Sequence, residues 1–292
     1  MENKRILVIG GTGYIGSNIV DILLEKNYAI TTLSRRDKKN IVCKSIKHTN
    51  IKHIKCDLLD KSAILKEVIN FDVVIYLAAI VKSFNKSKYK ENIISLKNTI
   101  NAMNHNNAKK MIYFSTQNVF IDKTGPYGNS KKICEKVLQD SSLDYIIIRP
   151  NYVYGVDKDN YFYNSYRIMK NLNVSLVIGD GETKFQPINK KDLAKITFRC
   201  LEEWTSKEEI NASGKKTLTL NNIINIIKRE ANFKYIVPIH IPWWLVQWGK
   251  WLIPFDINGF IKDRIAPPSS NIRLGEMDLE RDIQKIIKQK EH

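Results

Sequence analysis

Short apolar runs alternate with amphipathic stretches through the first half of the chain. The apolar runs that predict strands are Arg5–Ile9, Ala29–Leu33, Lys52–Lys55, Asp72–Leu77, Lys110–Ser115 and Tyr145–Ile148. The stretches between them that predict helices are Ser17–Lys26, Lys61–Ile69, Asn92–Asn104 and Ser130–Gln139. Continuous apolar strands separated by helices are typical of a parallel sheet with helices on both faces. The pattern therefore predicts an α/β fold with a doubly wound parallel sheet.

The pattern becomes less regular after Pro150. Residues 151–166 are mostly aromatic and polar and are predicted to form loops. The later predicted elements are a strand at Val174–Ile178, a turn at Gly179–Gly181, and helices near Asp192–Trp204, Asn221–Arg229 and Leu279–Lys288. We therefore predict a main domain over residues 1–155 and a smaller C-terminal substrate lobe over residues 156–292, interleaved with the last elements of the main sheet.

Charge and cysteine usage narrow the function classes. The chain carries 47 Lys and Arg against 30 Asp and Glu, a net charge of +17, but the basic residues are scattered and no nucleic-acid-binding motif is visible. We therefore expect no nucleic-acid partner. Cys43, Cys56, Cys134 and Cys200 have no metal-ligand spacing, which predicts free thiols and no metal site. No transmembrane-length apolar run and no signal peptide are visible, so a cytoplasmic protein is expected.

A glycine-rich turn follows the first predicted strand. Gly10, Gly13 and Gly16 have the spacing GxxGxxG, and the turn opens directly into the first predicted helix. Glycines at these positions let the backbone approach a pyrophosphate closely, and the N–H groups of a helix N-terminus bind anions. The turn predicts a dinucleotide-binding domain of the Rossmann type. Its predicted cofactor contacts are Gly10, Thr12, Gly13, Tyr14, Ile15 and Gly16.

The ends of the following strands indicate the kind of cofactor. Ser34, Arg35 and Arg36 follow the second strand, where an acidic residue would bind the ribose 2′-hydroxyl of NAD. Guanidinium groups match the oxygens of a 2′-phosphate, so we predict NADP. NAD stays open because Asp37 follows at once. The other predicted cofactor contacts are Asp57 and Leu58 beside the adenine, and Leu77, Ala78 and Ala79 beneath the dinucleotide.

Tyr127 and Lys131 form a YxxxK element at the start of a predicted helix. A spacing of four places both side chains on one helix face. An ammonium group close to a tyrosine favours the phenolate, so Tyr127 can act as a general acid or base at a carbonyl or an alcohol. Thr116 lies just past a predicted strand and can hydrogen-bond the same substrate oxygen.

These motifs, in this order, resemble the extended short-chain dehydrogenase/reductase superfamily of the NAD-dependent epimerase/dehydratase kind. The stretches that carry the resemblance are Gly10–Gly16, Asp57–Leu58, Leu77–Ala79, Phe114–Phe120, Tyr127–Lys131, Arg149–Gly155, Gly179–Gly181 and Asp192–Ala194. The resemblance implies an NAD(P)-binding Rossmann domain and catalytic roles for Thr116, Tyr127 and Lys131. It also implies a cofactor contact at Pro150 and hydride transfer between a nicotinamide and a substrate carbon.

The substrate implied by the resemblance is a nucleotide-linked or lipid-linked sugar, processed by an oxidoreductase or an epimerase. The candidate substrate contacts are Ile80, Gln117, Asn118, Asn151 and Lys184. Many members of the superfamily form homodimers through the helices that correspond to residues 92–104 and 130–139, and we expect the same here.

One position departs from the sugar-nucleotide members. These usually carry an arginine that clamps the diphosphate seven residues before the position of Asp192, where this chain has Phe185, with Lys184 beside it as a substitute. The Lys-Phe-Gln-Pro stretch is similar to the branch of the NADPH-binding accessory subunit of respiratory complex I. The alternative prediction is therefore a catalytically silent NADPH-binding structural or sensory protein.

The segment Trp243–Trp251 is rich in tryptophan. Pro242 suits a helix start, and Trp244, Trp248 and Trp251 recur at helical spacing. Three interpretations stay open: a helix packed inside the lobe, a pocket wall for an apolar substrate, or an interfacial helix. The third predicts a membrane-associated protein with peripheral contact through this segment.

Overall fold

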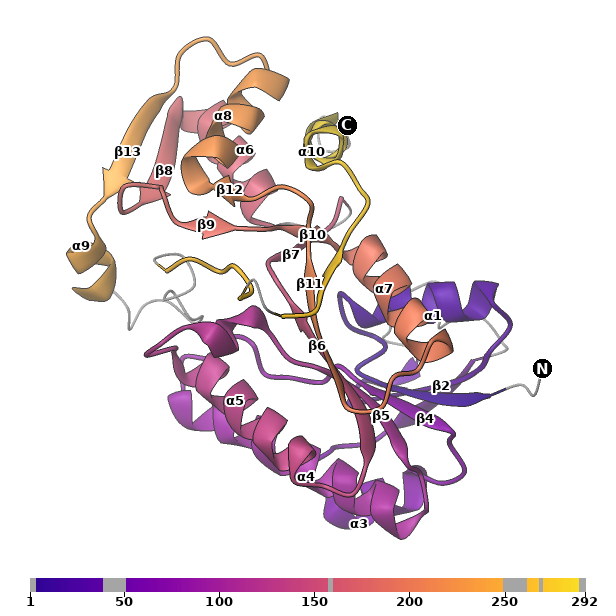
Figure 1. Cartoon of the computed structure of the whole chain (residues 1–292). Helices are drawn as coiled ribbons and strands as arrows, with labels where there is room; N and C mark the ends of the chain where they lie inside the picture. Colours follow the sequence, from indigo (N-terminus) through magenta and orange to yellow (C-terminus); the bar gives the residue numbers. More distant parts are fainter. Residues whose placement is uncertain (1–3, 39–50, 157–159, 249–261, 268–269, 289–292) are drawn as a thin grey trace.

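The computed structural model describes residues 4–38, 51–156, 160–248, 262–267 and 270–288. An eight-stranded parallel sheet in the order β14-β11-β6-β5-β4-β1-β2-β3 forms its centre (Figure 1). The strands are β1 (Arg5–Ile9), β2 (Ala29–Ser34), β3 (Lys52–Lys55), β4 (Val73–Tyr76), β5 (Lys110–Phe114), β6 (Asp144–Pro150), β11 (Glu208–Ser213) and β14 (Ile272–Leu274). The first six confirm the strands predicted from the apolar runs to within two residues.

Helices cover both faces of this sheet (Figure 1). They are α1 (Gly16–Glu25) and α7 (Lys190–Glu202) on one face, and α3 (Lys61–Glu67), α4 (Lys90–His105) and α5 (Pro126–Gln139) on the other. Alternate residues of β1 belong to the two cores, because successive side chains of a strand point to opposite faces. Ile6 and Val8 pack with α1, whereas Leu7 and Ile9 pack on the opposite side. The prediction of a doubly wound α/β fold is confirmed.

The smaller lobe consists of helices packed on short two-stranded sheets. Its helices are α6 (Tyr161–Leu172), α8 (Leu220–Glu230), α9 (Trp243–Trp248) and α10 (Leu279–Lys288). Its strand pairs are β7 (Val153–Tyr154) with β10 (Ile188–Asn189), β9 (Lys184–Phe185) with β12 (Leu218–Thr219), and β8 (Val174–Ile178) with β13 (Val237–Ile241). The short 3-10 helices η2 (Lys86–Tyr89) and η3 (Gln117–Phe120) belong to the main half. The domain division at residue 155 stays a prediction.

Part of the segment predicted as loop is helical, which corrects that prediction. Asn160 caps α6 by accepting hydrogen bonds from the backbone N–H groups of Phe162 and Tyr163. Phe162, Tyr166 and Met169 recur at helical spacing and are buried in the core of the lobe. The aromatic residues that suggested a loop are therefore the packing face of a helix.

A buried carboxylate fixes the helix α10 within the lobe. Asp282 is 1% exposed and accepts hydrogen bonds from the Tyr154 hydroxyl at 3.1 Å and from Asn189 Nδ2 at 2.8 Å. Tyr154 and Asn189 lie side by side in the β7–β10 pair. Because a buried carboxylate is costly without partners, these bonds fix α10 against the lobe.

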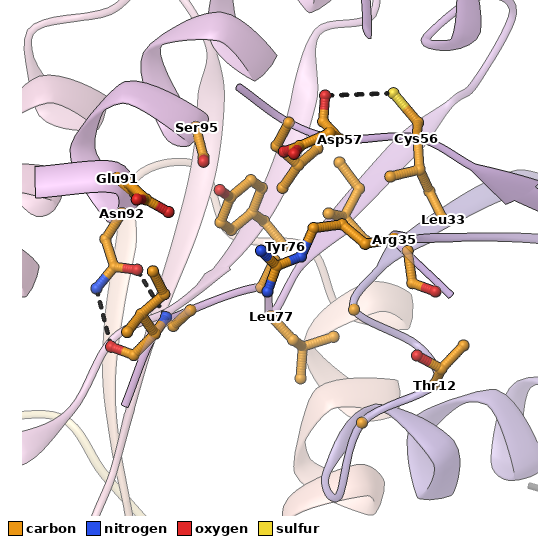
Figure 2. A pocket seen from close by; sticks show the side chains of 18 of the residues that line it. Thr12, Leu33, Arg35, Cys56, Asp57, Tyr76, Leu77, Glu91, Asn92 and Ser95 are labelled. Carbon is orange, nitrogen blue, oxygen red and sulfur yellow. Dashed lines mark hydrogen bonds between the residues drawn. The ribbon is translucent and has the colours of Figure 1, made fainter. Parts of the chain in front are cut away.

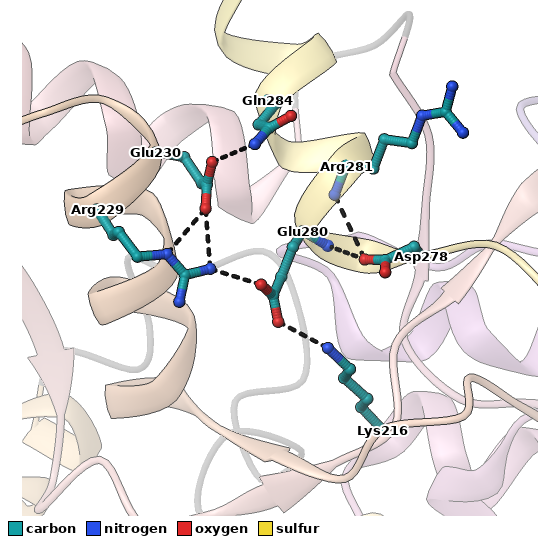
Figure 3. A network of polar contacts seen from close by, with 7 residues as sticks. All are labelled: Lys216, Arg229, Glu230, Asp278, Glu280, Arg281 and Gln284. Atoms are coloured by element: carbon teal, nitrogen blue, oxygen red, sulfur yellow. Dashed lines mark hydrogen bonds and ion pairs between the residues drawn. The ribbon is translucent and has the colours of Figure 1, made fainter.

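A surface network also joins α10 to α8 (Figure 3). Glu280 accepts from Arg229 and, at 2.6 Å, from Lys216, and Gln284 donates to Glu230. Lys216 and Arg229 lower the pKa of the Glu280 carboxyl through these hydrogen bonds. Exposed ion pairs contribute little to stability, so the isoleucines that α8 and α10 bury between them dominate this contact.

Three of the four cysteines, Cys56, Cys134 and Cys200, lie within the described residues and are free and buried, which confirms the prediction of free thiols for them. Cys43 lies outside the described residues. Within those residues, no helix has the length and apolar character needed to cross a bilayer.

An ion triad centred on a buried arginine–glutamate pair fixes α5 against the sheet. Arg149, at the end of β6, donates to both oxygens of Glu135 on α5 at 2.9 and 2.8 Å, and to Glu209 of β11 at 2.7 Å. The side chains of Arg149 and Glu135 are 8% and 9% exposed. Removing one partner of such a pair leaves a buried charge without compensation.

We therefore predict that Arg149→Met lowers the free energy of unfolding by about 3–5 kcal/mol. Urea unfolding followed by circular dichroism measures the change. The control is Asp140→Ala, which breaks the exposed pair of Lys136 and Asp140 on the same helix and should cost less than about 1 kcal/mol. Equal effects of the two substitutions would contradict the role given to the triad.

Candidate active site

A cavity of about 260 Å³ lies at the carboxyl edge of the main sheet, where β1, β2, β3 and β4 end (Figure 2). It collects most of the predicted cofactor contacts. Those that line it are Gly10, Thr12, Gly13, Ser34, Arg35, Arg36, Asp57, Leu58, Leu77, Ala78 and Ala79, together with the predicted substrate contact Ile80. The predicted contacts outside its lining are Tyr14, Ile15, Gly16 and Pro150.

The glycine-rich turn holds the start of α1 against the end of β1. Gly10 has a φ of +83°, and its N–H donates to the Leu33 carbonyl at 2.9 Å. A Cβ on Gly16 would lie 2.4 Å from the Gly10 oxygen, so only glycine permits this approach. The N-cap residue Ile15 gives α1 no side-chain cap. The N–H groups of Ser17 and Asn18 donate to the carbonyls of Gly13 and Ile15, so an anionic ligand such as a phosphate would meet the turn at the positive end of the α1 dipole.

The two arginines after β2 lie at the exposed rim of the cavity, with the Arg35 side chain extending over it (Figure 2). His53 supports this loop: Nε2 lies 2.8 Å from the Arg36 carbonyl oxygen and Nδ1 lies 2.8 Å from the Thr32 hydroxyl. Asp37 does not line the cavity and pairs with Lys55 at 3.1 Å. Asp37, the residue that kept NAD open as the cofactor, therefore forms an ion pair with a lysine.

Asn92 is a site residue that the sequence analysis missed. It is 5% exposed on α4, and its amide binds both the N–H of Ile80 at 2.7 Å and the Ile80 carbonyl at 3.1 Å (Figure 2). It also donates to the Ser130 hydroxyl at 3.1 Å, and Ser130 donates to the Tyr127 carbonyl at 2.7 Å. Asn92 therefore links the cavity wall to the helix that carries the YxxxK element. A polar residue on the buried face of an amphipathic helix was the available signal.

Lys131 is buried and held by β5. Its side chain is 2% exposed, and Nζ donates to the Phe114 carbonyl at 2.6 Å and to the Tyr113 hydroxyl at 3.1 Å. Burial lowers the pKa of Lys131 to about 8. Tyr127 is half-buried one helical turn earlier, and its ring centroid lies 6.4 Å from that of Tyr89. Tyr113 was not expected as a partner of the lysine.

The segment after β5 carries Thr116, which caps η3 by accepting a hydrogen bond from the Asn118 N–H at 3.3 Å. Gln117 and Asn151, both predicted substrate contacts, are buried and bound to each other at 2.6 Å. Gln117 also donates to the Ser213 hydroxyl of β11 at 2.9 Å. These amides have protein partners that hold the site segments on β6 and β11.

Arg264 is a second residue that the sequence analysis missed. Its guanidinium donates to Asn118 Oδ1 at 3.4 Å, and its backbone carbonyl accepts from Asn151 at 2.5 Å. Its N–H donates to the carbonyl of Lys184, an exposed residue of β9. Phe185 is 5% exposed, and its ring packs on Tyr152 at 6.4 Å between centroids. The structure therefore brings an arginine from a distant segment to this end of the site.

The described residues contain no group of three or more His, Cys, Asp or Glu side chains able to hold a metal ion.

The buried lysine generates a pH prediction. Between pH 8 and the ordinary lysine pKa of 10.5, the unfolded chain binds more protons at Lys131 than the folded protein does. The contribution of Lys131 to the free energy of unfolding therefore rises with pH across this window. Lys131→Met should remove that rise, as measured by urea unfolding at several pH values. The control Lys136→Met, on the exposed side of α5, should keep it, and parallel curves for all three proteins would contradict the pKa shift.

Comparison with known proteins agrees with this geometry. Residues 6–213 match the model of the NAD dependent epimerase/dehydratase family. A Methanocaldococcus jannaschii protein provisionally named UDP-glucose 4-epimerase is 28% identical over 266 residues, 78% of this chain and 83% of that protein. The UDP-glucose 4-epimerase of Mycoplasma genitalium is 30% identical over 174 residues, about half of each chain (50% and 51%).

Solved structures share the fold over nearly the whole chain. UDP-glucose 4-epimerase of Thermotoga maritima, with UDP-glucose, has a TM-score of 0.76 at 20% identity and covers 98% of both chains. UDP-glucuronic acid 4-epimerase of Bacillus cereus, with UDP-glucuronic acid and NAD, has a TM-score of 0.74 at 21% identity, covering 98% of this chain and 99% of the other. This chain therefore belongs to the NAD dependent epimerase/dehydratase family and is an enzyme of the extended short-chain dehydrogenase/reductase kind.

Proposed function

We propose that this enzyme is an epimerase that acts on a nucleotide-linked sugar with a bound nicotinamide dinucleotide. The observation that carries the proposal is the connection between the cavity and α5. The cavity is lined by the glycine-rich turn at one end and by Ile80 at the other, and Asn92 binds Ile80 to the start of the helix that bears Tyr127. The names of the relatives favour a nucleotide-linked over a lipid-linked sugar.

The residues of the cavity fit a dinucleotide. The Gly10–Gly16 contact leaves no room for a side chain, which suits the close approach of a pyrophosphate to the backbone at a helix N-terminus. Ala78 and Ala79 add only small side chains to the cavity wall. A dinucleotide held by the glycine-rich turn and by Ala78 and Ala79 would supply reversible hydride transfer at the sugar carbon.

Tyr127 is the general base and acid for the sugar hydroxyl that is oxidised. Its phenolate oxygen takes the proton of the sugar hydroxyl as the carbon–hydrogen bond breaks, and the resulting phenol gives the proton back when the sugar carbonyl is reduced. The Thr116 hydroxyl orients the same sugar oxygen. Lys131, which has a lowered pKa and lies one turn further along α5, supplies positive charge that favours the phenolate of Tyr127.

The diphosphate of the substrate is assigned to Arg264, with Lys184 beside it. The guanidinium of Arg264 lies next to Asn118, at the segment that carries Thr116. Phe185 is buried against Tyr152, so the ring at the position of the usual arginine belongs to the packing of the lobe. The Arg264 guanidinium, which comes from another part of the chain, can therefore form charge-assisted hydrogen bonds to an anion.

Of the two nicotinamide dinucleotides we assign NADP, with Arg35 and Arg36 binding its 2′-phosphate. Both arginines line the cavity, whereas Asp37 is bound to Lys55. The Bacillus cereus structure contains NAD, so the assignment needs a direct test.

Tyr127→Phe should lower turnover of a UDP-sugar by about 10²–10⁴-fold, because the proton acceptor is lost. Dinucleotide affinity should stay within about twofold, since the phenol does not bind the pyrophosphate. Coupled epimerase assays with several UDP-sugars and calorimetry with the dinucleotide measure both effects. The control is Tyr235→Phe, which removes an exposed phenol far along the chain.

Full turnover by the Tyr127→Phe enzyme would disprove the role of the phenol. Tight dinucleotide binding by the wild-type protein without turnover of any sugar would instead favour the catalytically silent alternative.

The double variant with Arg35→Ala and Arg36→Ala should bind NADPH about tenfold or more weakly, because charge-assisted hydrogen bonds to the 2′-phosphate are lost. Its affinity for NADH should barely change. Parallel calorimetric titrations of wild-type and variant protein measure this. A wild-type preference for NAD(H) would overturn the NADP assignment.

A further inference from the structure

The β8–β13 pair has an unusual outer face. In β8, Ser175 and Val177 are 2% and 1% exposed and point into the lobe, so the other three side chains point outward. The parallel register places these three directly beside three residues of β13. The outward residues are Val174, Leu176 and Ile178 on β8, and Val237, Ile239 and Ile241 on β13.

This face is aliphatic at every position, although the solvent side of a small sheet normally carries polar residues. Its exposure is substantial: Leu176 is 38%, Ile239 43% and Val237 61% exposed. Contiguous exposed apolar surface of this kind marks an interaction site.

Aromatic residues extend the surface at both ends of β13. Tyr235 precedes the strand and is 86% exposed. The helix α9 follows β13 directly (Figure 1). Pro242 lies between them, and Trp244 and Trp248 of α9 are 68% and 82% exposed. For these two indoles the interpretation of a helix packed inside the lobe is wrong. Trp251 lies outside the described residues.

Exposed lysines lie at one end of this surface, and the exposed Asp180 follows β8 at the other end. The sequence contains no Asp or Glu between residues 161 and 179, nor between residues 231 and 255. Lys170 and Lys234 are exposed where the chain enters β8 and β13. They lie at the same end of the sheet, because Lys170 sits over the Tyr166 ring at 5.6 Å and Tyr166 stacks on Phe233 at 5.8 Å.

We propose that this surface docks the enzyme on an anionic lipid membrane. Tryptophan and tyrosine rings are favoured at the boundary between headgroups and acyl chains, aliphatic side chains enter that boundary, and lysines pair with the lipid phosphates. A second copy of the chain would bring the same lysines and a net charge of +17, so like charges would meet. An anionic membrane complements both the apolar and the charged features.

The test uses the full chain and vesicles of phosphatidylcholine with and without phosphatidylglycerol. We expect cosedimentation with the anionic vesicles only, a blue shift of tryptophan emission, and weaker binding at high salt. No binding to anionic vesicles would overturn the proposal.

Two variants separate the apolar and charged contributions. The double substitutions Trp244→Ala with Trp248→Ala, and Lys170→Glu with Lys234→Glu, should each weaken vesicle binding by about tenfold or more. The matched controls are Ile69→Thr and Lys61→Glu, at exposed positions of the segment around α3, and these should bind like the wild type.

Binding of both double variants at the wild-type level would overturn the proposal. So would self-association of the wild-type chain in sedimentation equilibrium that the tryptophan variant abolishes, because it would assign the surface to a second copy. Thermal unfolding and dinucleotide binding of each variant show that it is folded. The outcome is independent of the proposed reaction, which the Tyr127 variant tests separately.

Discussion

The missing side chain at Gly16 is the constraint on which the site depends. The start of α1 can lie against the Gly10 carbonyl only because no Cβ intervenes, and this contact holds the helix terminus next to the Gly10–Gly13 turn that lines the cavity. Any larger residue would push α1 away from β1. Such a change would disturb both the ligand site and the core, because the same helix buries Ile19, Val20 and Leu23 on one face of the sheet. Ligand binding and packing are therefore set by one backbone approach.

Polar interactions then carry the geometry from the cavity to the reactive helix. Asn92 binds the chain after β4 to α5, and the Arg149 triad binds α5 to β6 and β11. Asn92, Arg149 and Glu135 are buried, so each would be costly without its partners. The site is thus supported from two sides by bonds that tolerate little displacement.

The sequence predicted the first six strands because central parallel strands are apolar throughout, and such runs are easily recognised. It did not predict β11, whose residues include Glu209, Asn211 and Ser213. Glu209 neutralises Arg149, and Ser213 binds Gln117, so polar residues here serve partners distant in sequence. The aromatic face of α6 was missed because its helical spacing was hidden among polar residues.

The candidate site was predicted where a local motif sufficed, as in the glycine-rich turn and the arginines after β2. Tyr113 and Arg264 could not be predicted, because their relevance depends on which strand lies beneath Lys131 and which late segment reaches Asn118. Such pairings are decided by tertiary structure. The roles assigned to Thr116, Tyr127 and Lys131 remain predictions that follow from the family and the geometry together.

The buried carboxylate of Asp282 has a consequence for how the chain acquires its structure during synthesis. Its partners Tyr154 and Asn189 are made long before it, and α10 follows every element of the lobe that it contacts. The lobe's core therefore stays incomplete, with apolar faces of α6 and α8 open, while more than half of the enzyme has already left the ribosome. Until α10 is synthesised and docks, the lobe exposes apolar surface that is prone to aggregation, so this chain should rely on chaperones during that time.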